Sequence, residues 1–146
     1  MKALPLAAVA AALLLTSVVS AQDRGRGEHI GRVVADCDRR ADEFQQSFRR
    51  ALEYREYRGH IRQEELDRHA EALSRSMGRV REAWNREHDA GRTRHFVEDA
   101  IKASREINHV MANEHFRPEL HRQWEGVRLE LNHLAEAFDL PPLRWE

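Results

Sequence analysis

The feature that most constrains the fold is a single apolar stripe that recurs in four segments of the chain. In each segment apolar side chains follow one another at alternating intervals of three and four residues, the spacing of helices that pack in a coiled-coil manner. The segments are about 28–57, 61–88, 94–114 and 118–138. A helix with one apolar face can bury it only against other helices. The pattern therefore predicts an all-α fold.

The stripe residues are the candidate core. In the first two segments they are Ile30, Val34, Cys37, Ala41, Phe44, Phe48 and Ala51, then Leu66, Ala70, Leu73, Met77, Val80 and Trp84. In the last two they are Val97, Ile101, Ser104, Asn108 and Met111, widened by Ala100, Ile107 and Val110, then Leu120, Trp124, Val127, Leu131, Leu134 and Phe138. We expect the polar pair Ser104 and Asn108 to fix the register or partner of their helix, and a ligand groove at that level is the alternative.

Glycines and prolines indicate where these helices begin and end. Glycines gather at 25–31 and recur at 59 and 91, Thr93 suits the N-cap of the third helix, and Pro118 suits the first turn of the fourth. Short linkers favour antiparallel neighbours, so we expect an up-down-up-down antiparallel four-helix bundle. The tail, 139–146, should fold back over the ragged end of this bundle, because Trp145 is too apolar to leave in water.

The first residues have the order of a secretory signal peptide. Lys2 precedes an apolar stretch from Ala3 to Leu15, and small residues follow up to Ala21. We predict cleavage after Ala21, a periplasmic or secreted location, and a single helical domain over 22–146. Because a membrane span needs about 20 apolar residues, we expect no stable membrane anchor after cleavage. An uncleaved anchoring helix is the alternative.

The charge balance argues against a nucleic-acid partner. The whole chain carries 24 Lys and Arg against 25 Asp and Glu, a formal net charge of −1. Nucleic-acid-binding domains usually show a clear basic surplus. Without one, we expect an unidentified protein partner or self-association.

The lone cysteine, Cys37, has no internal disulfide partner. It lies on the stripe of the first helix, so we expect a buried thiol that packs as a small apolar group. An intermolecular disulfide or a reactive thiol is the alternative, because free cysteines are uncommon in exported proteins.

Two Glu-x-x-His segments, Glu106 with His109 and Glu130 with His133, have the spacing used by di-metal helical bundles. In such centres all of these side chains point inward. Here Glu130 falls at the margin of its stripe, and the other three fall outside theirs. We therefore interpret the four as solvated surface residues and predict no metal centre. A looser zinc or copper site among the nine histidines is the alternative.

No other pattern indicates a cofactor or a catalytic centre. Covalent haem requires Cys-x-x-Cys-His, which the sequence lacks. Met77 and Met111 are the inward candidates for axial ligands of non-covalent haem, yet methionine at such positions is usually core filler. A nucleophile motif, a phosphate-binding loop and a catalytic carboxylate pair are also missing from the sequence. We predict a protein that is not an enzyme and carries no cofactor.

The stretch from Trp124 to Leu140 resembles the closing helix of a group of small exported helical proteins from soil bacteria, acidobacterial ones among them. The group also has a first helix similar to residues 44–52, followed by an arginine-rich connection like residues 55–62. The group has no assigned activity. The resemblance therefore implies export and a helical bundle, and it transfers no functional residue.

Together these patterns predict an exported, non-enzymatic helical bundle with a protein-protein interaction or structural role in the cell envelope. Two alternatives remain at the level of sequence. One is a periplasmic bundle that binds metal or haem, and the other is an envelope stress chaperone.

Overall fold

The computed structural model describes residues 8–53, 59 and 61–144, with side chains from residue 22 onward. These residues form four helices and no strand: α1 (Ala8–Glu53), α2 (Gln63–Glu87), α3 (Ala90–Asn113) and α4 (Pro118–Ala137). The all-α class is therefore confirmed for the described part of the chain. Residues 1–7 of the predicted signal peptide, the predicted end of the first helix at 54–57, and Trp145 lie outside the described residues.

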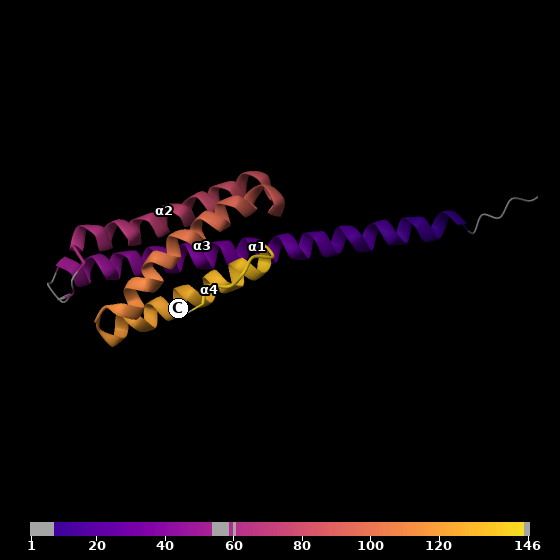
Figure 1. Cartoon of the computed structure of the whole chain (residues 1–146). Coiled ribbons are helices and arrows are strands. Elements are labelled where there is room, and N and C mark those ends of the chain that lie inside the picture. Colours follow the sequence, from indigo (N-terminus) through magenta and orange to yellow (C-terminus); the bar gives the residue numbers. More distant parts are fainter. Residues whose placement is uncertain (1–7, 54–58, 60, 145–146) are drawn as a thin grey trace, which may run out of the picture.

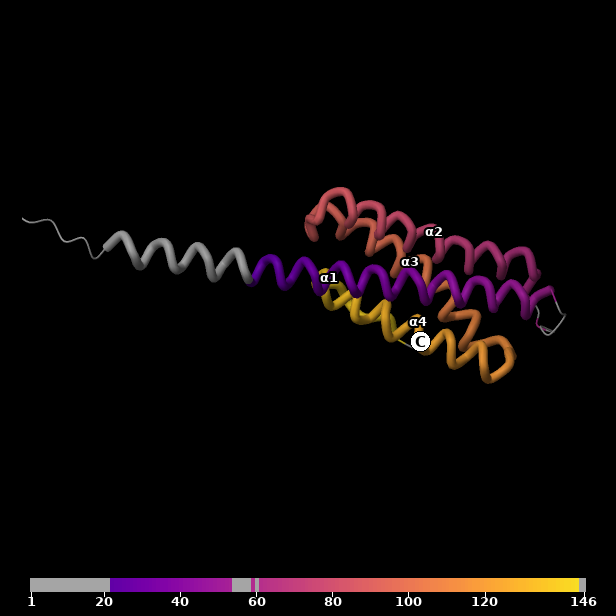
Figure 2. Tube along the Cα trace, turned by 180° about the vertical axis from the view of Figure 1, so that it is seen from behind, coloured from indigo at the N-terminus to yellow at the C-terminus, as the bar shows by residue number. Residues whose placement is uncertain are grey.

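The helices do not contact one another equally. α1 packs against both α2 and α4, and α3 packs much more extensively against α2 than against α4. Figure 1 shows the reason: α3 runs obliquely from the end of α2 toward the beginning of α4. Seen from behind, α1 lies between α2 and α4 (Figure 2). The α3–α4 pair is therefore the open seam of the structure.

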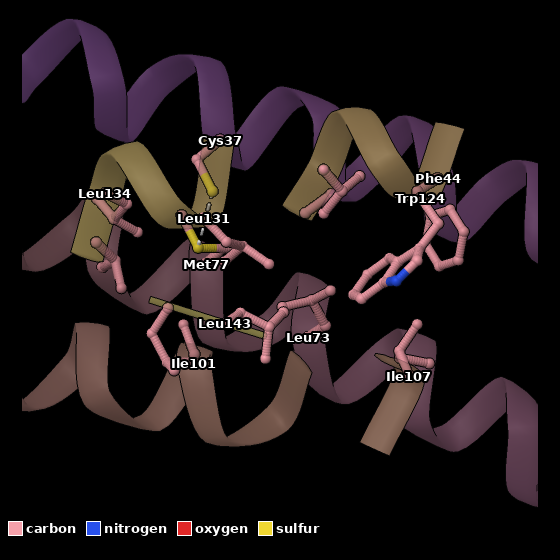
Figure 3. Packing of buried hydrophobic residues seen from close by; sticks show 14 of the residues in the cluster. Cys37, Phe44, Leu73, Met77, Ile101, Ile107, Trp124, Leu131, Leu134 and Leu143 are labelled. Carbon is pink, nitrogen blue, oxygen red and sulfur yellow. Dashed lines mark hydrogen bonds between the residues drawn. The ribbon is translucent and has the colours of Figure 1, made fainter. Parts of the chain in front are cut away.

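The predicted stripes form one shared hydrophobic core. The predicted core residues are buried, except that Ala51 is only partly buried. Figure 3 shows side chains from this core close by, among them Trp124 and Phe44. Their rings are 5.2 Å apart, and Trp124 is completely buried. Because burial of one large apolar side chain contributes about 1.5–3 kcal/mol, this shared core is the main source of cohesion.

Polar side chains also cross the α1–α2 seam. Arg81 donates to the Asp38 carboxylate at 2.7 Å, and Arg49 pairs with Asp67 at 3.1 Å. Burial raises the pKa of the Asp38 carboxyl above its ordinary value, and the Arg81 guanidinium opposes this rise. The Asp38–Arg81 pair therefore fixes the register of the two helices more than it stabilises them.

The beginning of α1 differs from the prediction. The helix starts at Ala8 and continues through the glycines at 25–31, where the sequence indicated a break before residue 28. An interior glycine lowers helix stability by about 1 kcal/mol but does not by itself end a helix. Gly31 is also a packing position, because a Cβ atom there would lie 3.2 Å from Nε1 of Trp84.

The backbone is helical on both sides of Ala21, and the cleavage after that residue stays a prediction. Figure 1 shows this part of α1 continuing past the ends of the other helices. Within the described ranges, no helix combines the length and the apolar character needed to cross a membrane.

The beginning of α3 also differs from the prediction. Asp89, not Thr93, is the N-cap, and its carboxylate accepts the backbone N–H of Arg92 at 3.0 Å. The helix therefore starts at Ala90 and includes Gly91 in its first turn. Thr93 lies one turn further along and is fully buried. A capping carboxylate at the earlier position accounts for the shift, because it satisfies a backbone N–H that the sequence-based start left outside the helix.

α4 begins with Pro118 in its first turn and ends in a Schellman motif. The N–H of Leu140 donates to the carbonyl of Ala135 at 2.8 Å, and the N–H of Asp139 donates to that of Glu136 at 3.1 Å. Asp139 adopts a φ of 55°, in the left-handed region that favours glycine. This residue turns the chain back toward the open seam.

We predict that Asp139→Gly raises the free energy of unfolding by about 0.5–1 kcal/mol, because glycine adopts the left-handed conformation without Cβ strain. Chemical denaturation followed by circular dichroism measures the change. Asp139→Ala is the matched control, since it removes the same exposed carboxylate but keeps a Cβ. Equal stability of the two variants would contradict the assignment.

Candidate functional site: the groove between α3 and α4

The C-terminal tail, residues 139–144, begins with the turn at Asp139 and then runs without regular secondary structure along the groove between α3 and α4. Pro141, Pro142 and Arg144 are exposed, whereas Leu143 is only 6% exposed and belongs to the core cluster. Figure 3 shows Leu143 among the buried residues of the helices. The sequence predicted a tail over the end of the bundle. The structure instead places it along the side, because α3 and α4 leave room there for one leucine.

The side chain of Asn132 on α4 holds the backbone of Leu143 from both directions. Its Oδ1 accepts the Leu143 N–H at 2.7 Å, and its Nδ2 donates to the Leu143 carbonyl at 3.4 Å. This is the pairing that a neighbouring β-strand would supply. One helical side chain therefore recognises an extended backbone without regard to most of its side chains.

Asn108 holds the next residue from the α3 side. Its Nδ2 donates to the carbonyl of Arg144 at 2.9 Å, and its Oδ1 accepts Nε1–H of Trp124 at 3.1 Å. The residue is 5% exposed. The amide thus links α3, α4 and the tail in one connected network, and both ends of its buried polar group are satisfied.

Arg94 anchors the start of the tail. Its two terminal nitrogens donate to the carbonyls of Phe138 and Asp139, at 3.0 and 3.2 Å. A guanidinium at the C-terminal end of α4 satisfies carbonyls that the helix leaves unpaired, and it complements the helix dipole. Glu98 pairs with the same guanidinium at 3.2 Å and holds it in place.

Open clefts flank the tail on both sides. A cleft of about 340 Å³ on the α3 side is lined by the tail, Arg105, Asn108 and His109. On the α4 side a cleft of about 420 Å³ is lined by the tail, Asn132, His133 and Glu136. The tail therefore occupies only part of the groove, and its exposed prolines are accessible from both sides.

The sequence indicated part of this site. Asn108 was expected to fix the partner of its helix, and its side chain accepts a hydrogen bond from Trp124 of α4. The alternative was a groove at the level of Asn108, and this residue does line the cleft on the α3 side of the tail. Ser104 is buried but makes only a local bond, to the carbonyl of Ile101 at 2.7 Å. The roles of Asn132 and Arg94 and the position of the tail along the groove were missed. The one available signal was an asparagine beside the stripe residue Leu131.

The four candidate metal ligands do not converge. Glu106 and His109 are exposed on α3, and His133 is exposed on α4. The Glu130 carboxylate differs from the predicted solvated surface group, because its side chain is only 16% exposed and pairs with Arg40 of α1 at 3.3 Å. Among the described residues, no group of three or more His, Cys, Asp or Glu side chains is placed to hold a metal ion.

Cys37 is completely buried, and its Sγ lies 3.7 Å from the Sδ atom of Met77. Burial raises the pKa of the thiol, and the nearby carboxylates of Glu130 and Asp38 raise it further. The thiolate is therefore disfavoured in the folded chain. The alternative, a disulfide with a second chain, would require the sulfur to leave the core.

No family model, curated protein or solved structure matches this chain. The groove and the tail within it are therefore the features from which a function can be inferred.

We predict that Asn108→Ala lowers the free energy of unfolding by about 2 kcal/mol, because it leaves the buried Trp124 N–H and the Arg144 carbonyl without their partner. It should also release the tail, which hydrogen exchange at the Leu143 amide reports. Ser104→Ala is the matched control on the same face of α3, and we expect it to leave the Leu143 amide protected. Equal loss of protection in the two variants would contradict the network.

Cys37 should react with a disulfide-exchange reagent roughly a thousandfold or more slowly in the native protein than in denaturant, because reaction requires opening of the core. A colorimetric thiol assay measures both rates. A native rate like that of a free thiol, or a cross-linked dimer on a non-reducing gel, would show that Cys37 leaves the core.

Proposed function

We propose that this chain is an exported, non-enzymatic helical bundle that binds an extended segment of another protein in the groove between α3 and α4. The observation that carries the proposal is the way in which the groove already holds residues 139–144. The two asparagine side chains, Asn132 and Asn108, bond to backbone atoms, and a core pocket receives one leucine. Backbone hydrogen bonds with one side-chain pocket are a recurring mode of peptide recognition.

The topology in this proposal is an up-down-up-down antiparallel bundle. Contacts between helices support this topology. In each pair of helices below, a residue further along one helix contacts a residue earlier in the other, which is the order expected for antiparallel helices. Asp38 pairs with Arg81, and Arg49 further along α1 pairs with Asp67 earlier in α2. The same order holds across α1 and α4, where Arg40 contacts Glu130 and Phe44 contacts Trp124. It also holds across α3 and the end of α4, where Arg94 contacts Phe138 and Asn108 contacts Trp124.

The location in this proposal is the periplasm or the cell exterior. Support comes from the signal-like order of residues 1–21 and from the resemblance to small exported helical proteins of soil bacteria. Removal of residues 1–21, which contain one lysine and no acidic residue, changes the formal net charge from −1 to −2. This near-neutral balance favours a protein partner over a nucleic acid.

The direct test uses the tail sequence as a separate ligand. A fluorescent peptide with the sequence of residues 139–144, Asp-Leu-Pro-Pro-Leu-Arg, is titrated with the full chain carrying Leu143→Ala. This substitution weakens the attached tail by removing its core contact. We expect saturable binding by fluorescence polarisation, and at least about tenfold weaker binding when Asn132→Ala is added, because the backbone clamp is then lost.

Two controls make the result specific. The peptide Asp-Leu-Pro-Pro-Ala-Arg has alanine in place of the leucine that corresponds to Leu143, and it should bind much more weakly. The unsubstituted chain should bind the original peptide weakly, since its own tail fills the groove. Absence of binding to a Leu143→Ala chain whose circular dichroism shows it folded would overturn the proposed function.

A further inference from the structure

The side chains of the tail that pack against the helices are three residues apart. Leu143 is buried and Leu140 is partly buried, and both pack against the core cluster. Pro141 and Pro142 lie between them and are exposed. In a β-strand alternate side chains share a face, so Pro141 would face the same way as Leu143. The observed order instead has the period of a polyproline II helix, which has three residues per turn.

The two prolines favour this conformation before the tail meets the groove. A proline ring fixes φ near −65°, and it restricts the preceding residue to extended values of ψ. Leu140 and Pro141 each precede a proline and are restricted in this way. The part of the chain that the structure describes contains no cis peptide bond, so both bonds to proline are trans. The short segment between the leucines is therefore stiff, and it brings both leucines to one side.

The groove supplies the hydrogen bonds that such a segment cannot make within itself. A polyproline II helix has no internal hydrogen bonds, so its buried backbone groups need partners outside it. Asn132 bonds to both backbone groups of Leu143, and Asn108 donates to the carbonyl of Arg144. The prolines have no N–H to satisfy, and they line the open clefts beside the tail. The groove thus contacts two apolar side chains and a stretch of backbone.

From this spacing we propose that the partner is a polyproline II segment of another protein with two leucines three positions apart, in the pattern Leu-Pro-Pro-Leu. It displaces residues 140–144, which otherwise fill the groove. This inference rests on the proposed function and adds the conformation and sequence class of the partner. The prolines favour binding because a stiff segment loses less conformational entropy when it is held.

The tail of a second copy has too short a reach to be this partner. Arg94 holds the carbonyls of Phe138 and Asp139 at the end of α4. The four residue steps from Asp139 to Leu143 span about 12 Å in a polyproline II helix. This is similar to the diameter of one helix with its side chains. An exchanged tail would therefore cross between two molecules with almost no slack, whereas a segment of another protein has no such tether.

The first test changes only the spacing of the leucines. The receptor is the full chain carrying Leu140→Ala and Leu143→Ala, which removes both apolar contacts of the attached tail. The labelled probes are Asp-Leu-Pro-Pro-Leu-Arg and Asp-Leu-Pro-Pro-Pro-Leu-Arg. The extra proline keeps the segment stiff but rotates the second leucine by about 120°. We expect the longer peptide to bind at least about tenfold more weakly by fluorescence polarisation, and equal binding would overturn the inference.

A third peptide tests the contribution of the prolines. Asp-Leu-Ala-Ala-Leu-Arg keeps both leucines at the same spacing but lacks the stiff segment between them. Because each proline in a compatible position restricts the unbound chain, we expect this peptide to bind about tenfold more weakly than Asp-Leu-Pro-Pro-Leu-Arg. Binding that is as tight as that of the proline peptide would show that the groove does not select a preformed polyproline II segment.

A measurement without any peptide tests the same spacing in the attached tail. Insertion of one proline between Pro142 and Leu143, in the otherwise unsubstituted chain, should turn the leucine away from its pocket. We expect the Leu143 amide to exchange at least about tenfold faster. Pro141→Ala is the matched control, since it keeps the spacing and should raise the rate only a few-fold. An unchanged rate in the insertion variant would contradict the inference, whether or not the doubly substituted chain folds.

The outcomes separate this inference from the proposed function. Equal binding of the three peptides overturns the polyproline II partner and leaves the groove as a peptide site. Binding of none of them to a folded receptor overturns both. If light scattering shows that the unsubstituted chain is a dimer and that Leu143→Ala makes it a monomer, the occupant is a second copy, and the inference is likewise overturned.

Discussion

The structure depends on the burial of four apolar stripes against one another. Each helix presents one stripe, and none can bury it alone, so the helices meet in one shared core with Trp124 and Phe44 in ring contact at 5.2 Å. Polar pairs such as Asp38 with Arg81 then select which faces meet, because a misplaced helix would leave a buried carboxylate without its partner. Apolar burial thus supplies the cohesion, and the polar pairs define the alignment.

The exception to this regular packing is the seam between α3 and α4. α3 crosses obliquely from α2 to α4, and the chain completes the core there with a leucine from its own tail. An extended segment brings unpaired backbone groups into a partly buried place, and these need partners. Asn132 and Asn108 supply them, and Asn108 also binds the indole N–H of Trp124. The structural need to satisfy a buried backbone has thus produced a site that can hold an extended peptide.

The same network links the proposed binding to the stability of the helical fold. A partner segment that displaced the tail would replace the contacts of Leu143 and the hydrogen bonds of Asn132 with equivalent ones, and the core would stay filled. The open clefts on either side of the prolines give an incoming segment room to approach. Cys37 lies in another part of the core, against Met77, and takes no part in this exchange.

The sequence by itself determined the all-α class and the residues that form the core, because periodic apolar spacing specifies which face of each helix must leave water. It also indicated Asn108 as a polar residue with a structural partner. The ends of the helices were harder to predict from the sequence. Asp89 caps α3 ahead of Thr93, and α1 continues through its glycines. Both differences arise because capping geometry and helix propagation depend on neighbouring turns. The tail in the α3–α4 groove, its clamp by Asn132 and its support by Arg94 were decided only by the tertiary structure. These contacts join residues from different elements, and they depend on the oblique path of α3, which no local pattern in the chain encodes.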